Sequence, residues 1–253
     1  MKNKLRKGGT CFGTMLRVLK SPQSFALCAS VEWDFVILDT EHNDFDLESL
    51  GTFSVLAKYE DLSMFVRVPD KLYHQLAQIL DIGAEGIVLP RVNTSGEVRQ
   101  IIQSTKYAPW GKRGVSISNT VTRFRDFEQK EYTKWANDEL LNIIQIESEE
   151  GVNNIRELVS IKGVDAVMIG PADLSQDMGI SGEITHAKAE EAYMEIIEAC
   201  NEYGVAPGIH FADMDLVQKW VKKGMRFITY SYDSKFIKDG FNNAISKLRG
   251  FTN

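Results

Sequence analysis

Eight short apolar runs recur along the chain and are separated by longer, more polar segments. The runs cover residues 10–16, 35–39, 63–68, 86–90, 140–147, 165–170, 206–211 and 226–231. Each is apolar nearly throughout rather than at every second position. That pattern is typical of parallel strands that are covered on both faces, so we expect eight parallel strands.

The intervening segments predict amphipathic helices. Residues 70–84 carry apolar side chains on one helical face and stop near Gly83. Residues 186–204 repeat this pattern and end at a glycine, and residues 213–224 begin with Asp and have lysines in their last turn. Eight strand–helix units in one chain predict an α/β fold, a (β/α)8 TIM barrel that forms a single domain over residues 1–253. An open doubly wound sheet is disfavoured, since no G-x-G-x-x-G motif follows the first strand.

Composition narrows the possible partners. The chain has 253 residues, a net charge of −6 and no basic stripe, so we expect no nucleic-acid partner. No apolar run approaches the roughly 18–20 residues of a membrane span, and no apolar stretch of signal-peptide length follows the basic start. Three widely spaced cysteines, Cys11, Cys28 and Cys200, indicate a reducing environment, and we expect a cytoplasmic protein.

Titratable side chains gather where the predicted strands end. In a (β/α)8 barrel the catalytic groups lie at the carboxyl ends of the strands, so these residues are expected to converge on one rim. They are Asp39, Glu41, His42, Arg67, Glu147, Asp173, His210 and Asp233. Taken singly, Glu147 or Asp173 could cap a helix, Arg67 could form a surface ion pair, and either histidine could be structural.

Glu147 and Asp173, on neighbouring strands, would form a site rich in hard oxygen ligands. Such a site suits Mg²⁺ or Mn²⁺ better than zinc, which prefers His and Cys. No lysine lies at a predicted strand end, which disfavours a Schiff-base aldolase. The loops after the last two strands contain acids and no glycine, which disfavours a phosphorylated substrate.

The sequence resembles the class II 2-oxo acid aldolases of the HpcH/HpaI family over nearly its whole length. The resemblance rests on "DFVILDTEH", "VRVPDKLYHQLAQILDIGAEGIVLPRV", "KYAPWGKRGVS", "IIQIES", "VDAVMIGPADLSQDMG" and "GVAPGI", in this order. It implies a barrel of the phosphoenolpyruvate/pyruvate-binding type. It also implies reversible cleavage of a 4-hydroxy-2-oxo acid into pyruvate, or a related 2-oxo acid, and an aldehyde. The implied cofactor is Mg²⁺, Mn²⁺ or Co²⁺, and the implied assembly is a hexamer, a trimer of dimers, with C-terminal helices exchanged between partners.

The resemblance also implies a role for individual residues at the 2-oxo acid end of the site. Glu147 and Asp173 would bind the metal. Gln145 and the backbone around Ala172 would hold the substrate, together with Asp173. Arg67 would lie against the keto oxygen and stabilise an enolate, whose charge needs a fixed cation.

The resemblance assigns proton transfer to His42, which would accept the proton of the 4-hydroxyl. Asp81, on the helix after the third strand, would raise the basicity of that histidine, which suits a base that titrates near neutral pH. Asp39 and Glu41 are then expected to shape the site or hydrogen-bond within it, since the metal already has two carboxylates.

The sequence departs from the family pattern at the aldehyde end. His210 replaces an apolar residue on the seventh strand, and Ser231-Tyr232 replaces a glycine-containing pair. Ala108 replaces the first of two prolines, and Met15 replaces an aromatic residue. We place His210 in the substrate pocket and name no particular aldehyde.

Two alternatives remain beside the metal-dependent aldolase. The first is a lyase for CoA thioesters of the citrate-lyase-β type, which would need a basic surface for the CoA phosphates. Arg113, Arg123 and Arg125 lie in the long segment 106–139 but are few and dispersed. The second is a non-catalytic protein that binds a 2-oxo acid on the same barrel.

Overall fold

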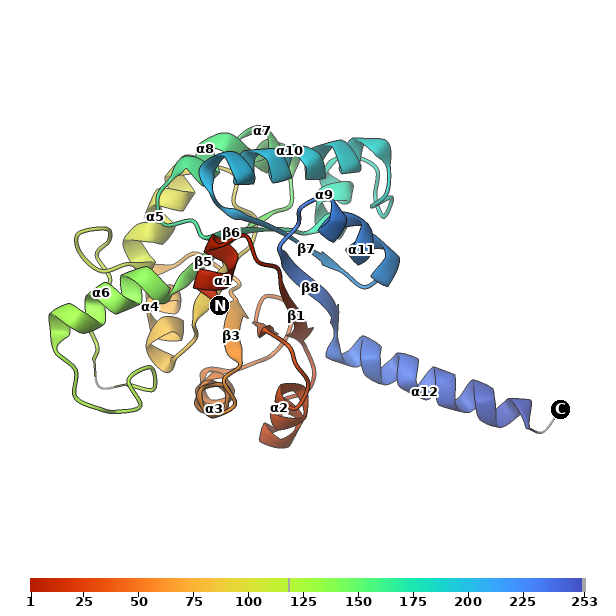
Figure 1. Ribbon diagram of the computed structural model, residues 1–253, viewed down its shortest axis with the longest axis horizontal. Coiled ribbons are helices and arrows are strands. Elements are labelled where there is room, and N and C mark those ends of the chain that lie inside the picture. Colours follow the sequence, from red (N-terminus) through yellow and green to blue (C-terminus); the bar gives the residue numbers. More distant parts are fainter. Residues whose placement is uncertain (118, 252–253) are drawn as a thin grey trace.

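A closed barrel of eight parallel strands, in sequential order, forms the centre of the molecule (Figure 1). The structure is a computed structural model that describes residues 1–117 and 119–251. Its strands are β1 (Cys11–Leu16), β2 (Phe35–Asp39), β3 (Ser63–Arg67), β4 (Gly86–Leu89), β5 (Leu141–Ile146), β6 (Ala166–Ile169), β7 (Ala206–Phe211) and β8 (Phe227–Tyr232). The predicted (β/α)8 fold is confirmed, and each predicted strand end lies within one residue of the observed one.

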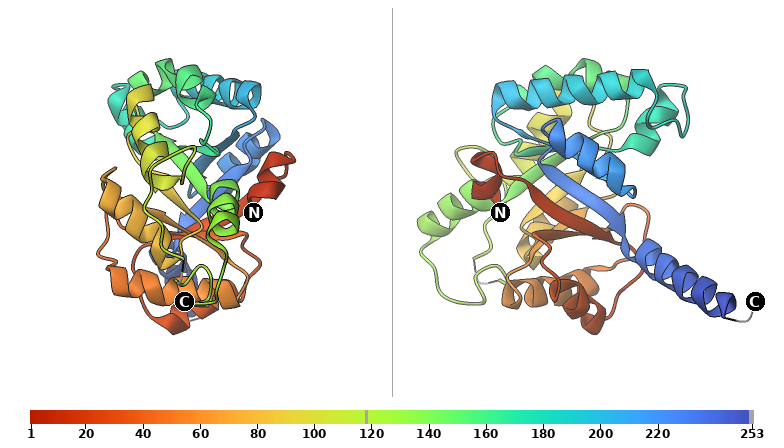
Figure 2. Two further views of the ribbon diagram at one scale, coloured as in Figure 1. Left: turned by 90° about the vertical axis from the view of Figure 1, so that its left-hand side faces the viewer. Right: turned by 45° about the vertical axis from the view of Figure 1, so that its right-hand side comes forward.

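Helices connect consecutive strands around the barrel, except that the first helix precedes the first strand and the last helix follows the last strand (Figure 2). They are α1 (Lys2–Arg6), α2 (Pro22–Ala29), α3 (Leu47–Tyr59), α4 (Tyr73–Ile82), α5 (Ser95–Thr105), α6 (Gln129–Glu139), α7 (Glu149–Asn153), α8 (Ile155–Ser160), α9 (Pro171–Asp177), α10 (Ala187–Tyr203), α11 (Met214–Lys222) and α12 (Asp233–Gly250). The three helices predicted from periodicity are confirmed as α4, α10 and α11. Gly204 ends α10 in the left-handed conformation, with φ of 71°, which glycine adopts without steric cost.

Aromatic side chains fill the interior of the barrel. The rings of Phe35 and Phe227 stack with their centroids 4.5 Å apart, and Phe65 lies 5.5 Å from Phe35. Gly13 makes room for this cluster, because a Cβ atom there would lie 2.4 Å from the ring of Phe35. The interior is therefore a packed core rather than a channel, and a substrate has access only to the ends of the barrel.

The last helix, α12, projects away from the barrel (Figures 1 and 2). Several of its large apolar side chains are exposed, including Phe241, Ile245 and Leu248. An exposed apolar helix of this length is unusual on a monomer surface. Among the described residues, no helix is both long enough and apolar enough to cross a membrane.

Candidate active site

Two adjoining cavities open at the carboxyl ends of the strands, with volumes of about 290 and 250 Å³. His42 and Asp173 line both cavities, so the two form one continuous site. Glu41, Arg91 and Glu147 line the first cavity, and the second is lined by Arg67, Gln145, Ala172, His210, Met15, Arg17 and Tyr232. The structure thus brings together every predicted site residue except Asp81.

Arg67 is fixed by a two-pronged ion pair with Asp39. The two residues end neighbouring strands in register, and Nε and Nη2 of Arg67 donate to the two carboxylate oxygens at 2.9 and 2.8 Å. Both side chains are buried. Burial raises the pKa of Asp39, but hydrogen bonds and charge from Arg67 outweigh this and lower it overall. Asp39 therefore stays ionised and holds the guanidinium in one orientation.

Glu41 lies between two arginines and His42 at the rim. Its Oε2 lies 3.2 Å from Nη1 of Arg67 and 3.8 Å from Nε2 of His42, and its Oε1 accepts a hydrogen bond of 2.6 Å from Arg91. The side chain of His42 is half exposed, whereas that of Glu41 is 4% exposed. His42 is therefore accessible from the cavity and has a carboxylate neighbour, though not the one that the sequence suggested.

Glu147 is a buried carboxylate, and no cationic side chain among the described residues forms an ion pair with it. It accepts hydrogen bonds from the backbone N–H of Arg91 at 3.1 Å and from the side-chain amide of Gln145. Burial, together with the negative charges of Asp173 and Glu41, raises its pKa to about 7. Gly170 allows this arrangement, since a Cβ atom there would lie 2.5 Å from Oε1 of Glu147.

Asp173 lies in the first turn of α9, exposed at the rim of the same cavity. Asp173 destabilises the charge of Glu147, and a divalent cation bound by the two carboxylates would relieve this. The described residues contain no group of three or more His, Cys, Asp or Glu side chains placed to hold a metal. Mg²⁺ and Mn²⁺ fit such a site, because they commonly bind through one or two carboxylates and complete their coordination with water and substrate.

His210 faces the second cavity from β7 and is partly buried. Burial, and then the positive charges of Arg67 and Arg17, lower its pKa to about 4, so its imidazole is neutral at physiological pH. Its Nδ1 has no hydrogen-bond partner among the described residues, and neither does Oε1 of Gln145. Both atoms are thus available to a polar ligand.

Most of the sequence matches a known protein family. Residues 15–239 match the model of the HpcH/HpaI aldolase/citrate lyase family. A 4-hydroxy-2-oxo-heptane-1,7-dioate aldolase from Shigella sonnei is 32% identical over 224 residues, which cover 87% of this chain and 83% of the relative. The chain belongs to the HpcH/HpaI family.

Two further members of the family support this assignment. A hydroxypyruvate/pyruvate aldolase from Roseobacter denitrificans is 29% identical over 233 residues, covering 92% of this chain and 90% of that protein. The crystal structure of an HpcH/HpaI aldolase from Desulfitobacterium hafniense has a TM-score of 0.95 and 32% identity, covering 98% and 96% of the two chains. The chain is therefore an enzyme of the carbon–carbon lyase class.

Arg17 is a site residue that the sequence interpretation missed. It follows β1 directly, lines the second cavity, and places its guanidinium 4.8 Å from the ring centre of Tyr232. Asp233 fixes this loop, because its Oδ2 accepts hydrogen bonds from the backbone N–H groups of residues 17, 18 and 19. Arg17 directly follows the first predicted strand, and this position was the sequence signal that could have identified it as a site residue.

Ser231 marks another departure at the aldehyde end. It adopts φ of 54°, in the left-handed region that glycine favours, and the family pattern has a glycine-containing pair here. Its Oγ has no hydrogen-bond partner among the described residues. A non-glycine residue in this conformation costs roughly 1–2 kcal/mol. The replacement of glycine at this position thus carries strain next to the substrate cavity.

Asp81 does not lie beside His42 within one chain. It is the penultimate residue of α4, which leads into the start of β4, whereas His42 follows the end of β2. The two residues are therefore at opposite ends of the barrel. Asp81 forms an ion pair of 2.5 Å with Arg113 instead. The predicted pairing of Asp81 with His42 is therefore not made within one subunit.

The arginines of segment 106–139 do not form a basic surface at the site. Arg113 is buried against Asp81 and lies 4.9 Å from the ring centre of Tyr107. Arg123 donates a hydrogen bond of 2.7 Å to the carbonyl of Lys58. Neither arginine lines the cavities that contain Glu147 and Arg67. This placement offers no support for the CoA-thioester alternative within the family.

Proposed function

We propose that this family member is a divalent-metal-dependent aldolase. It would cleave a 4-hydroxy-2-oxo acid reversibly into pyruvate, or a related 2-oxo acid, and an aldehyde. The observation that carries the proposal is a carboxylate pair, Glu147 and Asp173, which shares one site with a guanidinium that Asp39 holds in place. The names of the relatives, a 4-hydroxy-2-oxo-heptane-1,7-dioate aldolase and a hydroxypyruvate/pyruvate aldolase, support the same substrate class.

Glu147 and Asp173 would hold the metal, which we propose to be Mg²⁺ or Mn²⁺, with Co²⁺ as a further candidate. When bound, the cation supplies positive charge to the 2-oxo group of the substrate. Glu147 must be ionised to act as a ligand, and its raised pKa of about 7 makes this pH-dependent. Metal affinity should therefore increase as the pH rises through neutrality.

Arg67 would stabilise the negative charge that develops when the bond between C3 and C4 breaks. A guanidinium has five N–H donors. Nε and Nη2 of Arg67 donate to Asp39, and Nη2 also donates to Sδ of Met15, whereas Nη1 is only ion-paired with Glu41. The remaining donors can face a substrate oxygen in the second cavity, which Arg67 lines. Because the Asp39 pair fixes the guanidinium in advance, no reorganisation is needed when the charge appears.

His42 would accept the proton of the 4-hydroxyl group. It lines both cavities and is half exposed, so a substrate that spans them would pass beside it. Gln145 and the backbone at Ala172 would orient the 2-oxo acid. Neutral His210 would hydrogen-bond a polar group of the aldehyde portion through its unpartnered Nδ1.

The proposal predicts retro-aldol activity that depends on metal. Purified protein with Mg²⁺ or Mn²⁺ should release pyruvate from a racemic 4-hydroxy-2-oxo acid, which coupling to lactate dehydrogenase would measure. EDTA should abolish the release, and added metal should restore it. Activity that persists unchanged in EDTA would rule out the proposed roles of Glu147 and Asp173. Binding of pyruvate and metal without any turnover would favour the binding-protein alternative.

We also propose that α12 packs against another copy of the chain in a homo-oligomer built from dimers. The exposed fractions of Phe241 (71%) and Leu248 (58%) support this, since an apolar helix face of this kind is rarely left in water. Sedimentation analysis should give the mass of a hexamer. Replacement of both residues by Ser should lower that mass. A wild-type protein that sediments as a monomer would contradict the proposal.

A further inference from the structure

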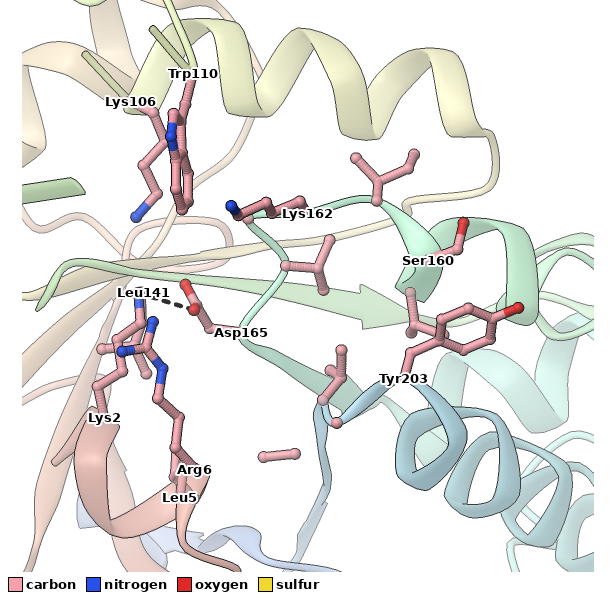
Figure 3. Close-up of a pocket in the computed structure, with 17 residues that line it drawn as sticks. Lys2, Leu5, Arg6, Lys106, Trp110, Leu141, Ser160, Lys162, Asp165 and Tyr203 are labelled. Atoms are coloured by element: carbon pink, nitrogen blue, oxygen red, sulfur yellow. Dashed lines mark ion pairs between the residues drawn. The ribbon is translucent and has the colours of Figure 1, made fainter. Parts of the chain in front are cut away.

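A second polar cavity lies at the amino ends of the strands, at the opposite end of the barrel from the candidate active site. Its volume is about 300 Å³. It is bounded by α1, the start of β5, the segment 159–165 before β6, and the end of α10 (Figure 3). None of the proposed catalytic or metal-binding residues lines it, so its chemistry is separate from the aldol reaction.

Two buried lysines form the base of this cavity. Nζ of Lys106 donates to the carbonyls of Asn137 and Leu140 at 2.9 and 2.7 Å. Nζ of Lys2 donates to the same Leu140 carbonyl at 3.0 Å and pairs with Asp165 at 2.8 Å. Each ammonium group has three donors. The described residues therefore leave each lysine one N–H without an acceptor.

Two exposed cations, Arg6 and Lys162, form the rim. In Figure 3 the side chains of Lys2, Arg6, Lys106 and Lys162 surround the carboxylate of Asp165. Lys162 lies 4.0 Å from the ring centre of Trp110, and neither rim cation has an acidic partner among the described residues.

The cavity carries more positive charge than its own residues balance. Asp165 is the only acid among the described residues that line it, against four cationic side chains. Asp165 is also committed to Lys2 and to the backbone N–H of Asn142, at 3.0 Å. Arg6 and Lys162 are thus left without a counter-charge, and so is Lys106 when it is protonated, an arrangement that favours an added anion.

We propose that this cavity binds a small tetrahedral oxyanion with two negative charges, such as inorganic phosphate or the phosphoryl group of a small metabolite. Ammonium and guanidinium groups are the usual protein ligands of such anions. The spare N–H groups of Lys2 and Lys106 would contact the anion at the base, and Arg6 and Lys162 would close over it from the rim. The site would act apart from the catalytic centre, as a site for an effector or a stabilising anion.

The charge state of Lys106 provides an additional readout. Burial lowers its pKa to about 7; nearby Asp165 opposes this, and Lys2 and Arg6 add to it. The other titratable groups around the cavity are Lys162 and Tyr203. A bound dianion would favour the protonated lysine, so anion affinity should fall as the pH rises from 6 to 8.5. Sulfate is the suitable probe, because its charge is constant over this range.

The test measures sulfate and phosphate binding to the full-length protein by calorimetry and by the shift in melting temperature. Sodium chloride at equal ionic strength controls for screening, and succinate distinguishes a dicarboxylate from a tetrahedral oxyanion. Arg6→Gln and Lys162→Gln remove exposed rim cations. Lys130→Gln, an exposed residue without an ion pair among the described residues, is the control for the change in net charge.

Sulfate and phosphate should each raise the melting temperature of the wild type above the chloride control, as a ligand of the native state does. Each rim substitution should weaken sulfate binding by about tenfold, the effect of one charge-assisted hydrogen bond, whereas Lys130→Gln should not. An equal response to sulfate and chloride would overturn the proposal. So would undiminished binding in Arg6→Gln and Lys162→Gln, or tighter binding of succinate than of sulfate.

Discussion

Replacement of Glu147 by Gln is expected to reduce retro-aldol activity by about a thousandfold or more, because it removes a buried metal ligand. The amide retains the size of the carboxylate but not its charge. Affinity for Mn²⁺, measured by calorimetry, should fall in parallel. Glu150→Gln is the matched control: it makes the same charge change three residues later, on an exposed side chain. Full activity with unchanged Mn²⁺ affinity in Glu147→Gln would exclude this residue as a ligand.

The same substitution is expected to make the metal-free protein more stable at pH 8. The pKa of Glu147 is about 7 in the folded state, against 4.5 ordinarily. Between these values the folded protein binds a proton that the unfolded chain does not. The wild type therefore loses stability as the pH rises from 4.5 to 7, by roughly 2–4 kcal/mol.

Glutamine avoids this loss because it does not ionise. Its amide can accept only one of the two hydrogen bonds that Arg91 and Gln145 donate, which costs about 1 kcal/mol. Urea unfolding in EDTA should thus show a net gain for Glu147→Gln at pH 8 that shrinks toward pH 5. If Glu147→Gln were less stable than the wild type at pH 8, Glu147 would not carry a buried, uncompensated charge in the folded protein.

Replacement of Arg67 by Lys is expected to reduce kcat by about a hundredfold to a thousandfold, with little change in Mn²⁺ affinity. Lysine preserves the charge but cannot form both hydrogen bonds to Asp39 while also facing a substrate oxygen. The lost geometry, rather than lost charge, would account for the effect. Steady-state kinetics would measure the loss of kcat, and calorimetry would show whether Mn²⁺ affinity is preserved.

The control for Arg67→Lys is Arg156→Lys. Arg156 is an exposed arginine paired with Glu195 and Glu202 on the helical surface, and its replacement should leave the kinetics unchanged. If Arg67→Lys retained wild-type kcat, the bidentate pair with Asp39 would have no role in catalysis. If it lost metal binding as well, Arg67 would be acting on the metal site rather than on the substrate.

The barrel could be predicted from the sequence because its signals are local. The run 35–39 is apolar at its first four positions and ends in Asp39, and the structure buries all five residues. Glycines and capping residues mark helix ends, as Gly204 does for α10. The projection of α12 could not be predicted in this way, since the helical spacing of its apolar residues fits packing on the barrel equally well.

The composition of the candidate site followed from topology, but its pairings did not. The strand ends predicted that Arg67 and Glu147 would lie on one rim, and in the structure they line adjoining cavities. The partner of each charge depends on side-chain geometry over long sequence separations. Asp39 pairs with Arg67, 28 residues away, and Asp81 with Arg113, 32 residues away. For the same reason the basic cavity built from Lys2, Lys106 and Lys162 left no signal in any single motif.

Exchange of the pyruvate methyl protons with deuterium tests the central claim most directly, because it reports formation of the enolate without requiring the correct aldehyde. Proton NMR in D₂O would follow the methyl signal with Mg²⁺, with EDTA, and in the Glu147→Gln and Arg67→Lys variants. Rapid exchange is predicted only for the wild type with Mg²⁺. Exchange that continues at the same rate in EDTA, or in both variants with Mg²⁺, would contradict a metal- and Arg67-dependent aldolase.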